Sequence, residues 1–237
     1  MSEHIAQYPG TELGRLVQRA RRLRPFTERM LRTIGVRRGM RVLDVGCGIG
    51  DASMLAADLV GPSGVVVGID ADGASVELAG RRIADAGLHQ AEIAAVDLAE
   101  FGDPEPFDVV VCHRVLVWRD DPAGFLRRAA RFARPGGVVA IHEVEVCRAP
   151  VWPPRGSSAA GHGDVGPRLV AAFVDAALSC PNVLSEVTPP EQGASRRLPR
   201  AAASEGSPRN TLPQLSQYCA WVRLPRPGTG RRADAEY

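Results

Sequence analysis

The residues of this sequence with the clearest chemical potential form a glycine-rich loop. The apolar run 42–45 leads directly into Gly46, Gly48 and Gly50, which alternate with other residues. Glycine reaches positive φ angles and has no Cβ, so the main chain of such a loop can approach a ligand closely. Residues 51–59 then have the composition of a helix. A strand, a glycine turn and a helix N-terminus together predict a ligand site at the carboxyl edge of an α/β sheet.

The spacing of these glycines indicates which ligand the loop holds. The dinucleotide fingerprint G-x-G-x-x-G would need a third glycine where the sequence has Asp51. The pattern from Asp44 to Gly50 is instead D-x-G-x-G-x-G, which resembles motif I of the class I S-adenosylmethionine-dependent methyltransferases. A pyrophosphate is disfavoured by nearby carboxylates, whereas a sulfonium with an ammonium group gains from Asp44. We therefore expect S-adenosyl-L-methionine as the cofactor and disfavour a dehydrogenase.

The charge distribution agrees with a cationic ligand. The 237 residues have a net charge of +2, which divides into +7 over residues 1–41, −10 over 42–195 and +5 over 196–237. The acidic middle fits a cationic cofactor and argues against a nucleic-acid-binding core. The arginine-rich first segment keeps an RNA methyltransferase as a less favoured alternative.

Strand-like and helix-like segments alternate along the chain. The predicted strands span residues 41–46, 65–70, 91–96, 107–112, 138–146 and 183–187, and the predicted helices span 51–60, 73–86, 122–132 and 166–178. This alternation predicts an α/β fold with a doubly wound, Rossmann-like, mostly parallel sheet and helices on both faces.

The two ends of the chain differ from this core. Residues 1–38 form a predicted helical segment that packs on the domain or covers the site as a lid, and Pro25 should divide it into two helices. Residues 39–188 are the predicted cofactor-binding domain, and the Pro- and Arg-rich residues 189–237 are expected to be disordered. No seventh strand is recognisable there, so the sheet edge would be incomplete and open to self-association as a homodimer. The same feature motivates the alternative of a non-catalytic protein on a methyltransferase fold.

Two further carboxylates end predicted strands. Asp70 ends the second strand, and its two oxygens can accept hydrogen bonds from both hydroxyls of a ribose. Asp97 ends the third strand and is followed by Leu98. An acid at the position of Asp70 would serve a nicotinamide dinucleotide equally well, so it supports adenosine binding without separating the two cofactors.

The methyltransferase resemblance covers about residues 35–187 and implies a role for each of these residues. It implies that the glycines approach the methionine moiety and that Asp44 helps to bind its ammonium group. It also implies that Asp97 contacts the adenine amine and that Leu98 packs against the ring. Cys47 within the loop and Ala71 after the second strand complete the implied cofactor site.

Candidate catalytic residues follow the fourth strand and lie within the fifth. His113 is at the carboxyl edge, where its ordinary pKa near 6.5 suits a general base, although it could equally be a polar lining residue. Arg114 could bind a substrate carboxylate or phosphate, or cap a neighbouring element. His142 and Glu143 face opposite sides of their strand, and Glu143 is the one we expect near the site.

Motifs that the sequence lacks argue against some classes of methyl acceptor. The sequence has no Asn/Asp-Pro-Pro-Tyr/Phe after the fourth strand, as in methyltransferases of amide or exocyclic nitrogens, and no Pro-Cys nucleophile there. Arg134-Pro135-Gly136-Gly137 is similar to the turn of small-molecule methyltransferases, and the match resembles the ubiquinone/menaquinone-type branch. We therefore expect O-, N- or C-methylation of a small-molecule acceptor.

The remaining sequence features concern metals and the compartment. The five cysteines form no C-x-x-C pair, so no metal site is expected. The N-terminus is polar, and no apolar run approaches the roughly 20 residues of a membrane span. A cytoplasmic protein without membrane contact is the expectation.

Overall fold

The computed structural model describes residues 12–116, 119–147, 165–188 and 214–227. The elements of this part of the chain are α2 (Glu12–Thr33), β1 (Arg41–Val45), α3 (Asp51–Val60), β2 (Val65–Asp70), α4 (Gly73–Asp85), β3 (Ala91–Ala95), β4 (Phe107–His113), α5 (Pro122–Ala130), β5 (Ala133–Cys147), α6 (Val165–Asp175), β6 (Asn182–Thr188) and β7 (Gln214–Arg223). Most boundaries lie within a few residues of the predicted ones.

The strands form one seven-stranded sheet in the order β3-β2-β1-β4-β5-β7-β6. Strands β1 to β5 pair in parallel, whereas β7 lies between β5 and β6 and is antiparallel to both. This arrangement confirms the mostly parallel, Rossmann-like sheet. The direction of chain progression reverses between β1 and β4, and open α/β sheets bind ligands at the carboxyl ends of the strands beside such a switch point.

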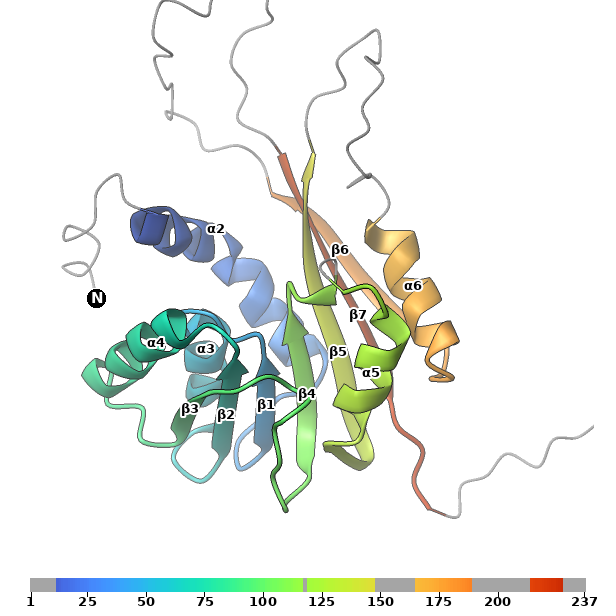
Figure 1. Cartoon of the computed structure of the whole chain (residues 1–237), viewed down its shortest axis with the longest axis horizontal. Coiled ribbons are helices and arrows are strands. Elements are labelled where there is room, and N and C mark those ends of the chain that lie inside the picture. Colours follow the sequence, from blue (N-terminus) through green and yellow to red (C-terminus); the bar gives the residue numbers. More distant parts are fainter. Residues whose placement is uncertain (1–11, 117–118, 148–164, 189–213, 228–237) are drawn as a thin grey trace, which may run out of the picture.

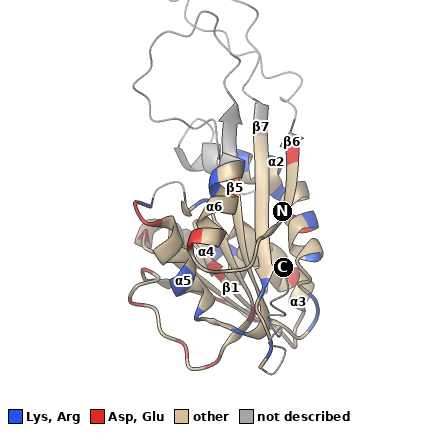
Figure 2. Cartoon of the chain, turned by 90° about the vertical axis from the view of Figure 1, so that its right-hand side faces the viewer, with Lys and Arg blue, Asp and Glu red and all other residues tan. Residues whose placement is uncertain are grey.

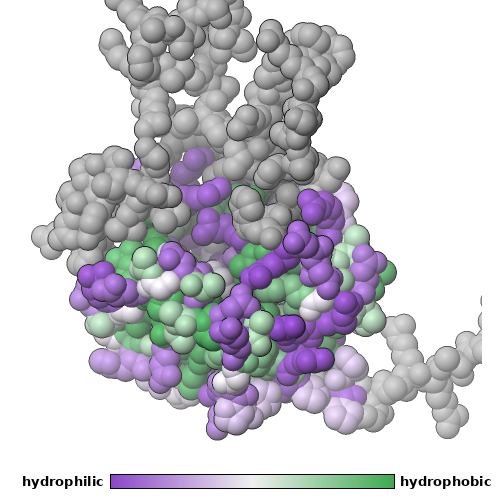
Figure 3. All heavy atoms as spheres, viewed as in Figure 1, coloured by the Kyte–Doolittle hydropathy of each residue, from purple (hydrophilic) through white to green (hydrophobic). Residues whose placement is uncertain are grey.

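Helices cover both faces of the sheet (Figure 1). One face packs against α5 and α6, the other against α2, α3 and α4. The fully buried large side chains of the two clusters include Phe107, Leu126, Phe173, Phe26, Met30 and Leu31. Charged residues concentrate in the helices and connecting loops around the sheet (Figure 2). Hydrophilic and hydrophobic residues are interspersed on the face that Figure 3 shows.

The first helix corrects one expectation. Residues Glu12–Thr33 form a single helix with Pro25 inside it. Pro25 has no amide hydrogen to donate to the Arg21 carbonyl, and both residues are exposed. The Thr27 hydroxyl donates to the Leu23 carbonyl at 3.1 Å. A proline inside a helix costs about 3 kcal/mol. Burial of Phe26 and other large side chains next to it, worth about 1.5–3 kcal/mol each, offsets that cost.

The C-terminal part corrects a second expectation. Residues Gln214–Arg223, assigned from the sequence to a disordered tail, form β7 and complete the sheet. The pattern was missed because this interior strand buries polar as well as apolar residues, among them Ser216 and Gln217. The presence of β7 removes the reason for expecting a degenerate, non-catalytic fold. The edge strand on this side is β6, and self-association stays a prediction. Residues 189–213 and 228–237 of the predicted tail lie outside the described residues.

Candidate active site

The glycine loop folds against the end of β4. Gly46, Gly48 and Gly50 have φ angles of 75°, 53° and 83°. The amide groups of Gly46 and Cys47 both donate to the Ile69 carbonyl, at 2.8 and 3.0 Å, which ties the loop to β2. A Cβ at position 46 would lie 2.2 Å from Cγ1 of Val115. At this position glycine is therefore required both by the backbone angle and by the close approach of the next loop.

Asp70 braces this loop from the end of β2. Its Oδ2 accepts from the Gly48 amide at 2.8 Å, and its Oδ1 accepts from the Asp72 amide at 2.9 Å. Each carboxylate oxygen has more than one lone-pair site, so both can accept a further hydrogen bond. Asp70 is half-buried. It can therefore hold the loop and still receive the hydroxyls of a ligand.

Asp44 is buried beneath the loop. Its Oδ2 accepts from the Ser53 hydroxyl at 2.6 Å, and within the described residues its buried Oδ1 has no hydrogen-bond partner. Burial raises the pKa of this carboxyl to about 7, and the nearby charges of Asp70 and Asp51 act in the same direction. An unpartnered buried carboxylate oxygen fits a cationic ligand group, which would lower this pKa again.

The third predicted carboxylate lies further along the sheet edge. Asp97 accepts from the Ala99 amide at 2.8 Å and lies 3.5 Å from the guanidinium of Arg119. Leu98 is buried in the core, and Ala71 is exposed after β2. Neither Asp97 nor these two neighbours line the cavity described next, so their predicted contacts with an adenine stay predictions.

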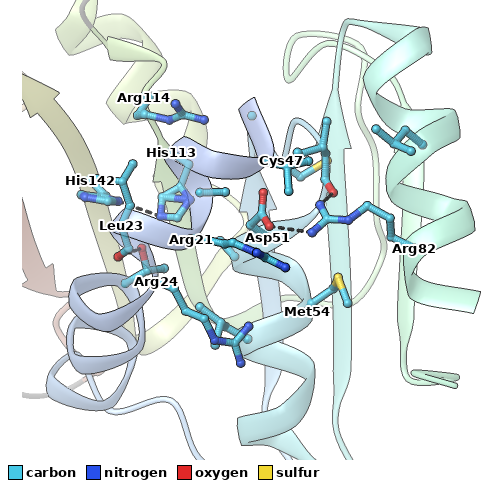
Figure 4. Close-up of a pocket in the computed structure, with 18 of the residues that line it drawn as sticks. Arg21, Leu23, Arg24, Cys47, Asp51, Met54, Arg82, His113, Arg114 and His142 are labelled. Atoms are coloured by element: carbon cyan, nitrogen blue, oxygen red, sulfur yellow. Dashed lines mark hydrogen bonds and ion pairs between the residues drawn. The ribbon is translucent and has the colours of Figure 1, made fainter. Parts of the chain in front are cut away.

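A cavity of about 370 Å³ opens between the loop and α2 (Figure 4). Its walls come from one face of α2, from the loop and the start of α3, from α4, and from the ends of β4 and β5. The volume lies in the range of small-molecule sites, about 300–1,000 Å³. Of the predicted site residues, Gly46, Cys47 and His113 line it. Burial raises the pKa of the Cys47 thiol, which leaves that group protonated and unreactive.

Two histidines form one wall of this cavity. Nε2 of His113 lies 3.0 Å from Nδ1 of His142, and the His142 ring stacks on Phe26 of α2 at 5.1 Å between ring centroids. Burial, followed by the neighbouring His142, lowers the pKa of His113 well below its ordinary value. Burial and then the charge of Arg114 lower the pKa of His142 to about 3. Both imidazoles are therefore neutral near pH 7, so one ring donates the shared hydrogen bond and the other accepts it.

Glu143, the neighbour of His142 on β5, was expected near the site but lies elsewhere. Glu143 is on the opposite side of β5, where its Oε1 accepts from the Leu116 amide at 2.7 Å. It is 1% exposed and is absent from the cavity lining. Alternation along the strand was predicted, but the inward-facing member of the pair is His142. Glu143 instead anchors the turn after β4, which follows His113.

Sequence reasoning also missed the arginines of this cavity. Arg21 and Arg24 line it from α2, and Arg82 lines it from α4. Arg82 donates to Asp51 at 2.7 Å and to the Ile49 carbonyl, which fixes the start of α3. Val17, Ala20, Arg21 and Arg24 lie on one face of α2, and this face lines the cavity. Their helical spacing is visible in the sequence, but the sequence pattern was interpreted only for the apolar face that packs on the sheet.

The described residues hold neither a metal cluster nor a membrane-spanning helix. They contain no group of three or more His, Cys, Asp or Glu side chains placed to hold a metal ion. No helix in the described ranges has an apolar stretch as long as a membrane crossing requires.

Comparison with known proteins agrees with this geometry. Residues 37–159 match a family model described as a methyltransferase domain. Nocamycin O-methyltransferase from Saccharothrix syringae is 35% identical over 154 residues, covering 65% of this chain and 51% of that protein. Demethylmenaquinone methyltransferase from Listeria monocytogenes is 30% identical over 123 residues, covering 52% of each. The chain thus spans about half the length of these curated relatives.

Solved structures show the same fold. A methyltransferase from Thermoplasma acidophilum superposes with a TM-score of 0.54 at 16% identity, covering 82% of this chain and 71% of that one. A SAM-dependent methyltransferase from Aquifex aeolicus gives a TM-score of 0.54 at 21% identity, covering 83% and 89%. Taken with the family match over residues 37–159, the glycine loop and the carboxylates at its strand ends establish that the chain belongs to the methyltransferase domain family, among the class I S-adenosylmethionine-dependent methyltransferases.

Proposed function

We propose that this protein transfers a methyl group from S-adenosylmethionine to a small-molecule acceptor. The observation that carries the proposal is one cavity with the glycine loop on one side and the neutral His113–His142 pair on the other. The bound cofactor supplies a methyl group that is already activated by its sulfonium. The protein then contributes mainly proximity, alignment and exclusion of water.

The residues on the loop side fit this cofactor. Asp44 offers an unpartnered buried oxygen for an ammonium group, and Asp70 offers acceptors for ribose hydroxyls. A Cβ at Gly48 would meet nothing within 4 Å, so open space adjoins the loop there. Asp97 with Leu98 and Ala71 would hold the adenine end.

The residues on the α2 side would serve the acceptor. Phe26 stacks on His142, and α2 covers the cavity from the side opposite the loop. His113 would accept a proton from an acceptor hydroxyl, and its lowered pKa suits an acceptor that is itself fairly acidic. The relative from Saccharothrix syringae is named an O-methyltransferase, which favours oxygen as the methylated atom.

Calorimetry with S-adenosylhomocysteine tests the cofactor half. Folded protein should bind it, and a folded protein that shows no binding would end the proposal. A radiolabelled methyl-transfer screen over phenols, enols, carboxylic acids and quinols tests the acceptor half. Transfer to an RNA panel but to none of these small molecules would favour the nucleic-acid alternative instead.

A further inference from the structure

The hydrogen bond between His113 and His142 can run in either of two directions. Nε2 of His113 lies 3.0 Å from Nδ1 of His142, and the two rings are tilted by 59° with their centroids 4.7 Å apart (Figure 4). Both imidazoles are neutral near pH 7 because their pKa values are lowered, so only one of these two nitrogens carries a proton. The position of that proton decides what His113 presents to the cavity.

The two directions give His113 opposite chemical properties. If His142 donates from Nδ1, Nε2 of His113 accepts, and the proton of the neutral His113 ring is on Nδ1, which can then only donate. If His113 donates from Nε2 instead, its Nδ1 keeps a lone pair. Because His142 occupies Nε2, Nδ1 is the ring nitrogen that His113 has left for a ligand in the cavity that it lines. Only the second direction makes His113 a proton acceptor.

The other nitrogen of His142 favours this second direction. When Nδ1 of His142 accepts, the proton of its neutral ring is on Nε2, a buried atom that has no hydrogen bond of normal geometry within the described residues. A buried N–H group needs an acceptor. The side chain of Gln217 on β7 interacts with His142 and raises its pKa, which is the effect of an acceptor on an imidazole. A proton on Nε2 therefore faces a suitable partner.

The pairing of β5 with β7 explains how Gln217 reaches this ring. His142 is opposite Cys219, and Val144 is opposite Gln217. Side chains two residues apart on a strand point to the same face, so all four lie on one face of the sheet. Gln217 is then the diagonal neighbour of His142, about 7–8 Å away along the sheet, which is within reach of a long side chain. Both residues are buried.

We propose that His142 is a positioning residue that accepts the Nε2 proton of His113, and that Gln217 holds His142 in the tautomer that this requires. Phe26 stacks on the His142 ring at 5.1 Å between centroids and so restricts its orientation. The proton of an acceptor hydroxyl then moves to Nδ1 of His113, and the positive charge of that ring is stabilised by the N–H that it donates to His142. The proposal rests on the proposed function, because it assigns the atom of His113 that would act in that reaction.

The first test reads the tautomers directly and needs no turnover. Long-range proton–nitrogen correlation spectra of protein with isotope-labelled histidine distinguish protonated from unprotonated ring nitrogens, and the spectra of His113→Gln and His142→Asn assign the two rings. Since the rings share one hydrogen bond, both must be the same tautomer. We expect the proton of each ring on Nε2. Protons on Nδ1 of both rings would overturn the proposal.

The second test measures turnover of an acceptor from the methyl-transfer screen. His142→Phe keeps a ring against Phe26 but accepts no hydrogen bond, so kcat should fall about ten- to a hundredfold while KM and the affinity for S-adenosylhomocysteine change little. His142→Asn keeps an oxygen close to the place of Nδ1 and should recover most of that loss. Cys219→Ala, opposite His142 on the same face of the sheet, changes packing alone and should keep the wild-type kcat.

The role of Gln217 has its own variant. Gln217→Met has a similar length and offers the His142 Nε2 proton no oxygen, so the spectra should show both rings shifted in part to the Nδ1 tautomer, with a lower kcat. Thermal unfolding checks that every variant is folded. Tautomers and kcat like those of Cys219→Ala would remove Gln217 from the arrangement.

The outcomes separate this proposal from the proposed function. A folded His142→Phe protein with the kcat of Cys219→Ala overturns the positioning role, and so does an equal loss of kcat in His142→Phe and His142→Asn, which would assign His142 to packing. Wild type that methylates no small molecule overturns the proposed function instead. In that case the spectra still decide the direction of the hydrogen bond between the two histidines.

Discussion

The two sides of the cavity are built in different ways. The proposed cofactor side lies at one continuous stretch, residues 44–51, of which Gly46, Cys47, Ile49 and Asp51 line the cavity. The proposed acceptor side is assembled from α2, the end of β4 and the middle of β5. The carboxylates of Asp44 and Asp70 are bonded to the first side, whereas arginines and histidines line the second. Donor recognition is therefore a local property of the chain, whereas acceptor recognition depends on how distant elements pack.

The two sides should also differ in how they tolerate substitutions. The glycines of the loop have positive φ angles, and a Cβ added at Gly46 would lie 2.2 Å from Val115, so even a small substitution there disturbs the backbone itself. The acceptor side consists of side chains on regular elements, where a substitution removes one contact and leaves the backbone unchanged. Substitutions on the two sides should therefore affect different measurements.

The largest expected effect is on the acceptor side. His113→Gln should reduce kcat by about 10²- to 10⁴-fold, because it removes a proton acceptor next to the reacting group. Affinity for S-adenosylhomocysteine should change little. Steady-state kinetics with an acceptor from the screen measures kcat, and calorimetry measures the affinity for S-adenosylhomocysteine. His89→Gln, on an exposed loop, is the matched control. Equal activity of the two variants would remove His113 from the mechanism.

On the cofactor side, Gly46→Ala should cost about 2–6 kcal/mol of unfolding free energy. The left-handed φ and the clash with Val115 each contribute about 1–3 kcal/mol. Gly48→Ala shares the positive φ but meets no neighbour, so it should cost only about 1 kcal/mol. Urea denaturation of both variants measures the difference. Similar losses in the two would show that the loop does not pack closely against the turn after β4.

Asp70→Ala should weaken binding of S-adenosylhomocysteine by about 1–3 kcal/mol, since it leaves polar partners unpaired. 5′-Methylthioadenosine, which lacks the amino-acid end, should lose as much, because it has the same ribose. Asp120→Ala, at an exposed position, is the calorimetric control. Unchanged affinity of Asp70→Ala for both ligands would assign Asp70 to the loop alone.

The smallest expected effect is a pH dependence on the cofactor side. Only the ionised Asp44 carboxylate attracts an ammonium group, so affinity for S-adenosylhomocysteine should rise about tenfold from pH 6 to pH 8. Asp44→Asn should abolish this rise. Calorimetry between pH 6 and pH 8 measures this affinity, and a wild-type affinity that does not change with pH would contradict the prediction.

The same shift predicts the sign of a stability change. The pKa of Asp44 is raised from 3.8 to about 7 by folding, so the native state binds the proton more tightly than the unfolded state does. Its contribution is fully present below pH 3.8 and is lost as the pH rises toward 7. Asp44→Asn should therefore be more stable than wild type at pH 8, by about 1–3 kcal/mol, and less pH-dependent.

Much of the fold could be predicted because it depends on local patterns. Apolar runs that contain Asp44 or lead to Asp70 and Asp97 mark three strands, and the boundaries of α3 agree with the prediction. The failures have physical causes. Pro25 was expected to end a helix, but it lies at an exposed position and its neighbour Phe26 is buried. Strand β7 was missed because Gln217 and Ser216 are buried in the middle of a sheet, contrary to the usual apolar pattern.

By itself, the sequence determined which donor this protein is built to hold. The glycines and Asp44 are contiguous, and their chemistry depends on backbone angles that only those residue types allow. The tertiary structure decided what faces that donor. The inward orientation of His142 on β5 and the face of α2 that brings Arg21 and Arg24 to the cavity follow from packing among elements more than 80 residues apart. The contact of Phe26 with His142 illustrates this packing. No local pattern encodes such a contact, because each partner alone looks like an ordinary core or surface residue.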